Sequence, residues 1–159
     1  MLFRSVESIA ICLLNSPANP EHEQRIADVV RAKSKDVAIS VSSQVLPMFS
    51  EYERTSEAVL NAYVMPLVCN YLRTLESELA RIGIKAPLYI MQSSGGMTTP
   101  ANSMSRPIEI IECGPAAGVV GAARLGLEQG HSDLITFDMG GTTAKASIDR
   151  KSTRLNSSH

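Results

Sequence analysis

Hydrophobic residues along the chain gather in short runs that are separated by polar segments. These runs predict strands over 8–14, 37–45, 87–92, 134–139 and 144–148, with one further apolar run at 108–111. A Gly-Gly pair lies between the last two runs, and such a pair reverses the chain at little steric cost. The sequence therefore predicts a hairpin over 134–148.

Between these runs, apolar residues recur three and four positions apart, which predicts helices. The expected helices cover about 20–33, 55–82 and 114–129. Pro66 lies inside the second one, and because proline lacks a backbone N–H, we expect a kink or two abutting helices there. Strands and helices that alternate in this way indicate an α/β fold.

The clearest chemical motif lies at the end of the run 134–139. Asp138 ends this apolar run, Gly140 and Gly141 follow, and the hydroxyls of Thr142 and Thr143 come next. Glycines have no Cβ to keep a polyphosphate away from backbone N–H groups, which can form an anion-binding concavity. A carboxylate at this point suits Mg²⁺, which favours one or two carboxylates together with phosphate oxygens and water. An ordinary hairpin with a Gly-Gly turn explains the same residues equally well.

Small residues dominate the start of the third predicted helix, between Gly114 and Ala123, with Gly118 inside this segment. A glycine inside a helix costs roughly 1 kcal/mol relative to alanine, so a close approach by another element should offset that cost. One interpretation is a helix that lines a nucleotide cleft or crosses a partner helix at a domain hinge. The other is tight packing against the sheet.

Two polar clusters elsewhere have two readings each. Glu51, Glu53 and Arg54 precede the long helix, where they either reach a substrate or form local ion pairs in a solvated loop. The segment 93–96 reads Ser-Ser-Gly-Gly, which suits either an anion-binding nest or an ordinary loop after a strand.

Composition and motif searches argue against several classes of function. The 159 residues correspond to one domain or to pieces of two, and the net charge of −1 gives no electrostatic argument for nucleic acid or a membrane surface. No apolar run reaches the length of a transmembrane helix. The odd number of cysteines, Cys12, Cys69 and Cys113, in apolar surroundings indicates reduced core residues of a cytoplasmic protein. The sequence contains neither a P-loop motif nor zinc-spaced cysteines, and no nucleophile–base pair is evident.

Both ends of the sequence lead us to expect a piece of a longer protein. A strand-like run begins as early as Ser8, and residues 149–159 read DRKSTRLNSSH, which is typical of a translated sequencing adaptor. We therefore expect 149–159 to be an artefact, leave it out of the fold prediction, and expect the natural sequence to be cut at Ile148.

Four motifs, in this order, resemble those of hydantoinase A/5-oxoprolinase proteins, which have an actin-like ATPase (ribonuclease H-like) fold. They are SEYERTS with VLNAY at 50–63, IMQSSGG at 90–96, GPAAG at 114–118 and FDMGGTT at 137–143. The resemblance covers nearly all of 6–148 and implies a partial fold, namely the end of the first domain and the first hairpin of the second. Residues 1–112 would be the C-terminal part of the hydantoinase A N-terminal domain. Residues 113–148 would be the connecting helix and the start of the ATPase domain.

The resemblance implies a fragment of an ATP-dependent cyclic amide hydrolase that opens hydantoin or 5-oxoproline rings, with a hydantoinase B-like subunit as a candidate partner. The alternatives are a subunit of an acetone-type carboxylase and a non-enzymatic, actin-like nucleotide switch. Because only the second of two phosphate loops is present, we expect the fragment to be inactive alone.

The resemblance also implies roles for individual residues. Asp138 would be the catalytic residue and would orient Mg²⁺ or its water, while Gly140, Gly141, Thr142 and Thr143 would contact the phosphates of ATP. Gly114 and Gly118 would shape the wall between the domains.

The loop departs from the common family pattern Gly-Gly-Thr-Ser-Thr-Asp, because this chain has Ala144 and Lys145 after the two threonines. The acid that ends the family pattern is therefore missing. Lys145 either faces a phosphate or points outward from its strand.

Overall fold

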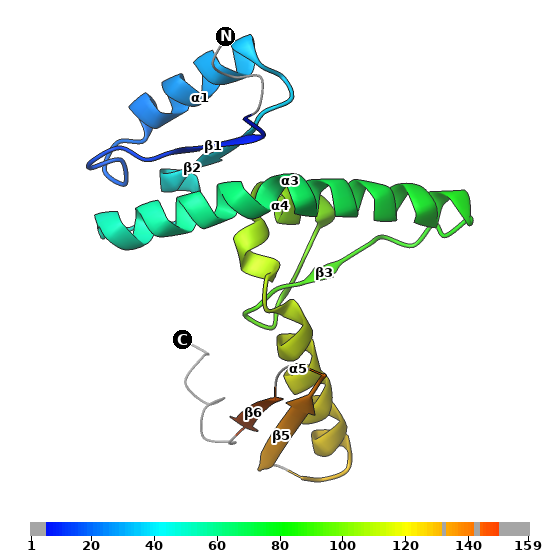
Figure 1. Ribbon diagram of the computed structural model, residues 1–159. Helices are drawn as coiled ribbons and strands as arrows, with labels where there is room; N and C mark the ends of the chain where they lie inside the picture. The colour runs from blue at the N-terminus through cyan, green and yellow to red at the C-terminus, as the bar shows by residue number, and fades with distance from the viewer. Residues whose placement is uncertain (1–5, 132, 142–143, 150–159) are drawn as a thin grey trace. The chain divides into compact units, whose positions relative to one another are not determined.

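The computed structural model describes residues 6–131, 133–141 and 144–149, and Figure 1 shows their secondary structure. The chain divides into two compact units. The first comprises the residues up to Tyr89 together with 99–108, and the second comprises 90–98 together with the residues from Glu109 onward. The sequence predicts a boundary between two family domains at residues 112 and 113, and this boundary stays a prediction.

The first unit is built on a parallel pair of strands. Strands β1 (Ser8–Ile11) and β2 (Ala38–Val41) pair in register, with Ser8 opposite Ala38 and Ile11 opposite Val41. Helix α1 (Glu21–Lys33) connects them, since parallel neighbours need a crossover connection. The long helix α3 (Glu51–Arg81) packs on the other side of the strands, so that in Figure 1 the pair lies between α1 and α3.

The core of this unit is small and apolar. Ile11, Ala27 and Val41 are buried, and Ile9 and Ile39 pack against them. Helix α2 (Ser42–Val45) and helix α4 (Pro100–Ser105) complete the unit by packing against α3.

The second unit combines one helix with two antiparallel strand pairs. The short strands β3 (Ile90–Met91) and β4 (Met97–Thr98) form one pair. Strands β5 (Leu134–Met139) and β6 (Ala144–Asp149) form the predicted hairpin, which packs against α5 (Cys113–Glu128). The contact between α5 and β5 is close at Gly126, where an added Cβ would displace the methyl groups of Leu134.

Several element boundaries differ from the predictions. The strand expected over 37–45 ends at Val41 and continues as α2, because the Ser42 hydroxyl and the Ser43 N–H both bind the carboxylate of Glu23. The run 108–111 falls mostly in a 3-10 helix, Pro107–Ile110, and the strand expected over 87–92 shrinks to β3.

The long helix also begins earlier than predicted, at Glu51 with Ser50 as its N-cap residue, rather than at Thr55 or Ser56. It runs through Pro66 as one helix, and buried residues on both sides, among them Ala62 and Leu72, hold its two halves against the rest of the unit. The alternative of two abutting helices is therefore wrong.

Sequence analysis missed α4. Its signal was nevertheless present, because Thr99 accepts a hydrogen bond from the Asn102 N–H and Pro100 occupies the first turn.

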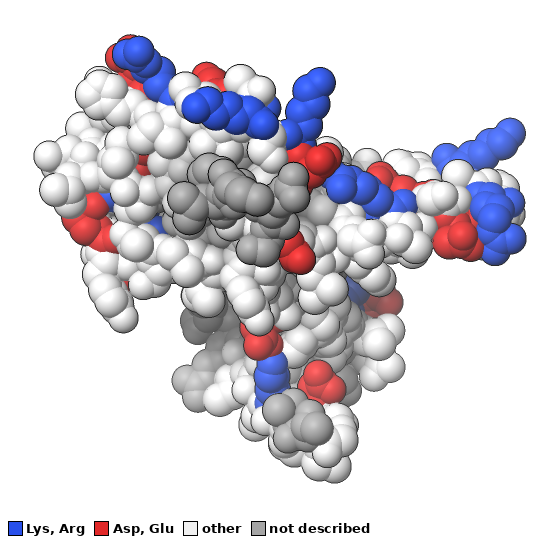
Figure 2. Space-filling view, turned by 45° about the horizontal axis from the view of Figure 1, so that its top comes forward, with Lys and Arg blue, Asp and Glu red and all other residues white. Residues whose placement is uncertain are grey.

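Charged side chains of both signs are interspersed over the face seen in Figure 2, consistent with the net charge of −1. Within the described residues, no helix combines the length and the apolar character that a membrane span requires.

Candidate functional site

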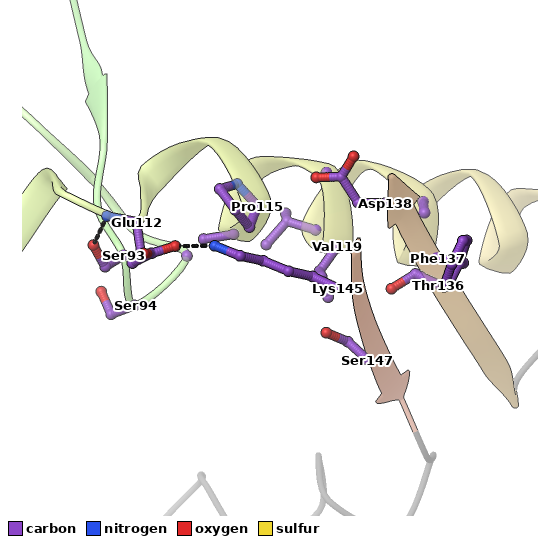
Figure 3. Close-up of a pocket in the computed structure, with 15 residues that line it drawn as sticks. Ser93, Ser94, Glu112, Pro115, Val119, Thr136, Phe137, Asp138, Lys145 and Ser147 are labelled. Carbon is purple, nitrogen blue, oxygen red and sulfur yellow. Dashed lines mark hydrogen bonds and ion pairs between the residues drawn. The ribbon is translucent and has the colours of Figure 1, made fainter. Parts of the chain in front are cut away.

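The candidate site is a cavity of about 560 Å³ in the second unit, bounded by the hairpin, α5 and the loop after β3. Side chains alternate along β5, so Thr136 and Asp138 share one face of the hairpin. The strand register puts Ser147 opposite Thr136 and Lys145 opposite Asp138. These four polar side chains line the cavity (Figure 3).

The opposite face of the hairpin is apolar and exposed. Ile135, Phe137, Met139 and Ile148 are each at least 65% exposed to solvent. The face with Thr136 and Asp138 therefore lies toward α5 and the cavity, and Phe137 from the apolar face also borders the cavity.

Small residues of α5 make room for the cavity. Pro115, Ala116, Gly118 and Ala122 line it, and none of them carries a long side chain. The loop after β3 closes one end of the cavity with Ser93, Ser94 and Gly95.

Gly95 is required in this loop for two reasons. It has a φ of +87°, which favours glycine, and a Cβ there would lie 3.2 Å from Cγ2 of Val120 in α5. The loop backbone thus approaches α5 more closely than another residue would allow.

Hydrogen bonds tie this loop to the start of α5. The Glu112 N–H donates to Oγ of Ser93 over 3.0 Å, and the Ser93 N–H donates to the carbonyl of Glu109 over 2.7 Å. Nε2 of Gln92 donates to the Glu109 carboxylate over 2.7 Å. Glu112, the N-cap residue of α5, is therefore held in place by its backbone.

Lys145 points into the cavity rather than outward from its strand. Its ammonium forms an ion pair with the carboxylate of Glu112, and Figure 3 shows the side chain extended in that direction. Both partners are partly exposed, with side-chain exposures of 41% for Lys145 and 62% for Glu112.

Asp138 lies directly opposite Lys145 but does not pair with it. Among residues 6–131, 133–141 and 144–149, no hydrogen bond or ion pair engages the Asp138 carboxylate. The same residues contain no group of three or more His, Cys, Asp or Glu side chains that could hold a metal ion. A Mg²⁺ ion here would have one protein carboxylate and would take its other ligands from phosphate and water, which is a common arrangement for this ion.

The structure brings together some of the predicted site residues. Asp138 and Gly118 border the cavity, whereas Gly114 lies in the first turn of α5 and does not line it. Gly140 and Gly141 follow β5 directly and are exposed. Thr142 and Thr143 lie outside the described residues.

The glycines in the first half of α5 do not pack closely against another element, although Ala123 at the end of the small-residue segment is buried. Nothing described in the structure lies within 4 Å of a Cβ built at Gly114, Gly118 or Gly121. Close packing against the hairpin occurs instead at Gly126, one turn or more further along the helix.

Glu112 is the site residue that sequence analysis missed. The only local signal for it is its position just before the helix, and its ion pair spans 33 positions of the sequence.

The charged cluster in the first unit has a different character from the expected solvated loop. Arg54 lies in the first turn of α3 and is fully buried. Its guanidinium donates to the carbonyls of Leu13 at 2.7 Å and Met48 at 3.0 Å and to Oγ of Ser42 at 3.0 Å, and it pairs with Glu51. The expected local ion pair is confirmed by Arg54 and Glu51, but the expected solvated loop is wrong for Arg54, which is buried in a helix.

Glu23 is the buried acid of the same cluster. Burial alone raises the pKa of its carboxyl, but hydrogen bonds from Ser42, Ser43 and Leu13 outweigh burial and lower the pKa below its ordinary value. Glu23 and Arg54 both bond to Ser42, so two buried charges of opposite sign meet at one hydroxyl. Because Glu23 and Arg54 each make several hydrogen bonds inside the protein, the cluster stabilises the fold and leaves little capacity for a ligand.

The three cysteines are free, and each is half-buried. Burial raises the pKa of the Cys69 thiol, and the nearby Arg73 offsets this only in part. A protonated thiol is a poor nucleophile.

Comparison with known proteins gives one family match. Residues 54–158 match the family model described as Hydantoinase/oxoprolinase. An uncharacterized protein of Methanocaldococcus jannaschii is 40% identical over 144 residues, which is 91% of this chain and 21% of that protein. Caprolactamase subunit alpha of Pseudomonas jessenii is 33% identical over 147 residues, or 92% of this chain and 21% of that subunit.

Solved structures agree with this match. A crystal structure of ATP-dependent caprolactamase from Pseudomonas jessenii aligns with a TM-score of 0.80 at 33% identity, covering 92% of this chain and 21% of that one. A nucleotide-free structure of acetone carboxylase aligns with a TM-score of 0.79 at 27% identity, covering 91% and 21%. The predicted α/β class and the predicted partial fold are both confirmed, and the chain spans about a fifth of the length of the relatives it matches.

Proposed function

The chain belongs to the hydantoinase/oxoprolinase family, and on that premise we propose that the full-length protein is an ATP-dependent hydrolase of cyclic amides. One relative is named a caprolactamase, and the enzyme in its crystal structure is described as ATP-dependent. These names support both the cyclic amide substrate and the use of ATP. Hydantoins, 5-oxoproline and lactams are the substrate classes to test. The substrate is a small molecule in each case.

The observation that carries the proposal is the position of Asp138. Its carboxylate ends β5, borders the cavity and precedes two glycines, and no described residue neutralises it. Asp138 and Lys145 are direct cross-strand neighbours, a position at which opposite charges attract each other. Here Lys145 pairs with Glu112 instead, and Asp138 is left for a cation.

The residues fit ATP and Mg²⁺ in the following way. Asp138 would hold Mg²⁺ or one of its waters, and the backbone N–H groups of Gly140 and Gly141, with the hydroxyls of Thr142 and Thr143, would bind phosphate oxygens. Gly118 keeps the α5 side of the cavity open, and Gly114 would shape the wall nearby. ATP, when bound, supplies the free energy that makes opening of a stabilised amide ring favourable. The task of these residues is to bind, orient and neutralise charge.

A second candidate is a subunit of an acetone-type carboxylase. The acetone carboxylase structure aligns almost as well as the caprolactamase structure, with TM-scores of 0.79 and 0.80. For either function we propose a hydantoinase B-like partner subunit, and from the three free cysteines we infer a cytoplasmic location.

The test uses the full-length protein, purified with and without a co-expressed hydantoinase B-like partner. Each preparation receives ATP and Mg²⁺ with hydantoin, 5-oxoproline or caprolactam, and ADP and the ring-opened product are measured together. We expect one of these substrates to give both products, with Asp138→Asn inactive. ADP and a carboxylated product formed only from a ketone and bicarbonate would support the carboxylase instead. No nucleotide turnover with any of them would overturn both and favour a non-enzymatic nucleotide switch.

The 159-residue chain alone serves as a control. We expect no turnover from it, because it carries only one of the two phosphate loops that the family resemblance implies.

A further inference from the structure

We propose that Lys145 is the phosphate-binding cation of this cavity and that Glu112 holds its ammonium until a nucleotide arrives. Lys145 and Glu112 would then set nucleotide affinity in opposite directions. This inference rests on the proposed function, since it concerns the same cavity.

The strand register places Lys145 in the site. It lies directly opposite Asp138 on β6, on the face that lines the cavity, and its side chain extends along the cavity toward α5. The residues that would contact phosphate, Gly140 and Gly141, lie on the same hairpin just after β5. A cation on this face is therefore within the region where the phosphates would bind.

The charge of Lys145 has a direct consequence for the site. Lys145 places a positive charge directly opposite the negative charge of Asp138. An acid here would add to the negative charge of Asp138 and would need a cation to bring a polyphosphate close. A lysine attracts the polyphosphate itself.

The Lys145–Glu112 ion pair is one that a nucleotide can displace. Both side chains are partly exposed, at 41% and 62%, and ion pairs of this kind contribute little to stability and weaken with salt. A polyphosphate carries more negative charge than a single carboxylate, so it competes well for the ammonium.

The backbone of Glu112 is fixed at the end of the cavity. Its N–H is bound to Oγ of Ser93 over 3.0 Å, and its carbonyl accepts the Ala116 N–H over 3.3 Å. The carboxylate therefore remains within reach of this end of the cavity and competes with the phosphates for Lys145. Removing its charge should tighten nucleotide binding.

The experiment measures the affinity of the full-length protein for ADP and for a non-hydrolysable ATP analogue by isothermal titration calorimetry with Mg²⁺. Lys145→Met should raise the Kd about tenfold, since it removes a charge-assisted contact, while Lys145→Arg should stay within about twofold. Glu112→Gln should lower the Kd about threefold at low salt, and this gain should shrink as salt screens the competing charge.

Glu128→Gln is the matched control, because Glu128 lies at the other end of α5 and pairs with Arg124 there. It should leave the Kd unchanged. The melting temperature of each variant checks that the fold is intact, and retained binding in Lys145→Arg excludes a general packing effect in Lys145→Met.

The outcomes separate this inference from the proposed function. Wild-type protein that binds no nucleotide overturns both. The role of Lys145 is overturned, and the proposed function stands, if the wild type binds nucleotide, Asp138→Asn weakens that binding in the presence of Mg²⁺, and Lys145→Met and Glu112→Gln leave the Kd unchanged. A higher Kd in Glu112→Gln than in the wild type also contradicts the proposal that Glu112 competes with phosphate for Lys145.

Discussion

The two units use their charged residues in opposite ways. In the first unit, Glu23 and Arg54 are fully buried, and their hydrogen bonds are satisfied inside the protein. In the second unit, Asp138, Lys145 and Glu112 border a cavity and are partly or largely exposed, and Asp138 is unpaired among the described residues. Buried, satisfied charges stabilise one arrangement, whereas exposed charges around a cavity remain available to a ligand.

The largest expected effect is on the buried side of this comparison. Arg54→Met should lower the free energy of unfolding by about 3–5 kcal/mol, because it leaves the carbonyls of Leu13 and Met48 and the hydroxyl of Ser42 without their donor. Denaturant unfolding of the full-length protein measures this loss.

Arg31→Met is the matched control for Arg54→Met. Arg31 pairs with Asp28 on the surface of α1, with side-chain exposures of 50% and 62%, so its loss should cost less than about 1 kcal/mol. Equal losses in the two variants would contradict the structural role assigned to Arg54.

The next largest effect concerns activity. Asp138→Asn should reduce ATP-dependent turnover about 100-fold or more, because it removes the charge that would hold Mg²⁺. Its melting temperature should stay within about 1 °C of the wild type, since the carboxylate is exposed and makes no described contact. Steady-state kinetics measures the loss of turnover, and calorimetric unfolding measures the melting temperature. A large drop in melting temperature would show that Asp138 stabilises the fold, as Glu23 and Arg54 do.

The pH dependence of stability should come from Glu23. Because folding lowers the pKa of its carboxyl, its stabilising contribution is fully present above the ordinary pKa and is lost as the pH falls through the lowered folded value. Glu23→Gln should therefore cost about 1–3 kcal/mol at neutral pH and progressively less in acid. Urea unfolding from pH 7 down to pH 3 measures the difference, with Glu21→Gln, an exposed residue of the same helix turn, as control.

The smallest effect on stability is expected at the exposed apolar face of the hairpin. In the 159-residue chain, Phe137→Thr should change the free energy of unfolding by less than about 0.5 kcal/mol, because Phe137 is 65% exposed. The same swap should reduce aggregation in light scattering. Val41→Thr, at a position 2% exposed, should instead cost about 1–3 kcal/mol, and equal costs would contradict the difference in burial.

Local signals were enough to predict part of this structure. The limits of β5 follow from its apolar run and from the glycines after it, and α5 follows from its small-residue segment with Pro115 near the start. Asp138 was predicted as a site residue because a carboxylate before two glycines suits a phosphate site without reference to any other part of the chain.

The features that sequence analysis missed depend on residues far apart in the chain. Strand β2 ends at Val41 because Glu23, about 20 positions earlier, binds Ser42 and Ser43. Helix α3 begins at Glu51 because Arg54 docks on Leu13 and Ser42. The partner of Lys145 could not be predicted either, because it requires the strand register and the position of α5 together.

Nucleotide binding by the full-length protein tests the central claim most directly. The account predicts that Mg²⁺ strengthens binding of a non-hydrolysable ATP analogue to the wild type and that Asp138→Asn loses this dependence on Mg²⁺ while keeping its melting temperature. Equal, Mg²⁺-independent binding by the two proteins would contradict the assignment of this cavity to ATP.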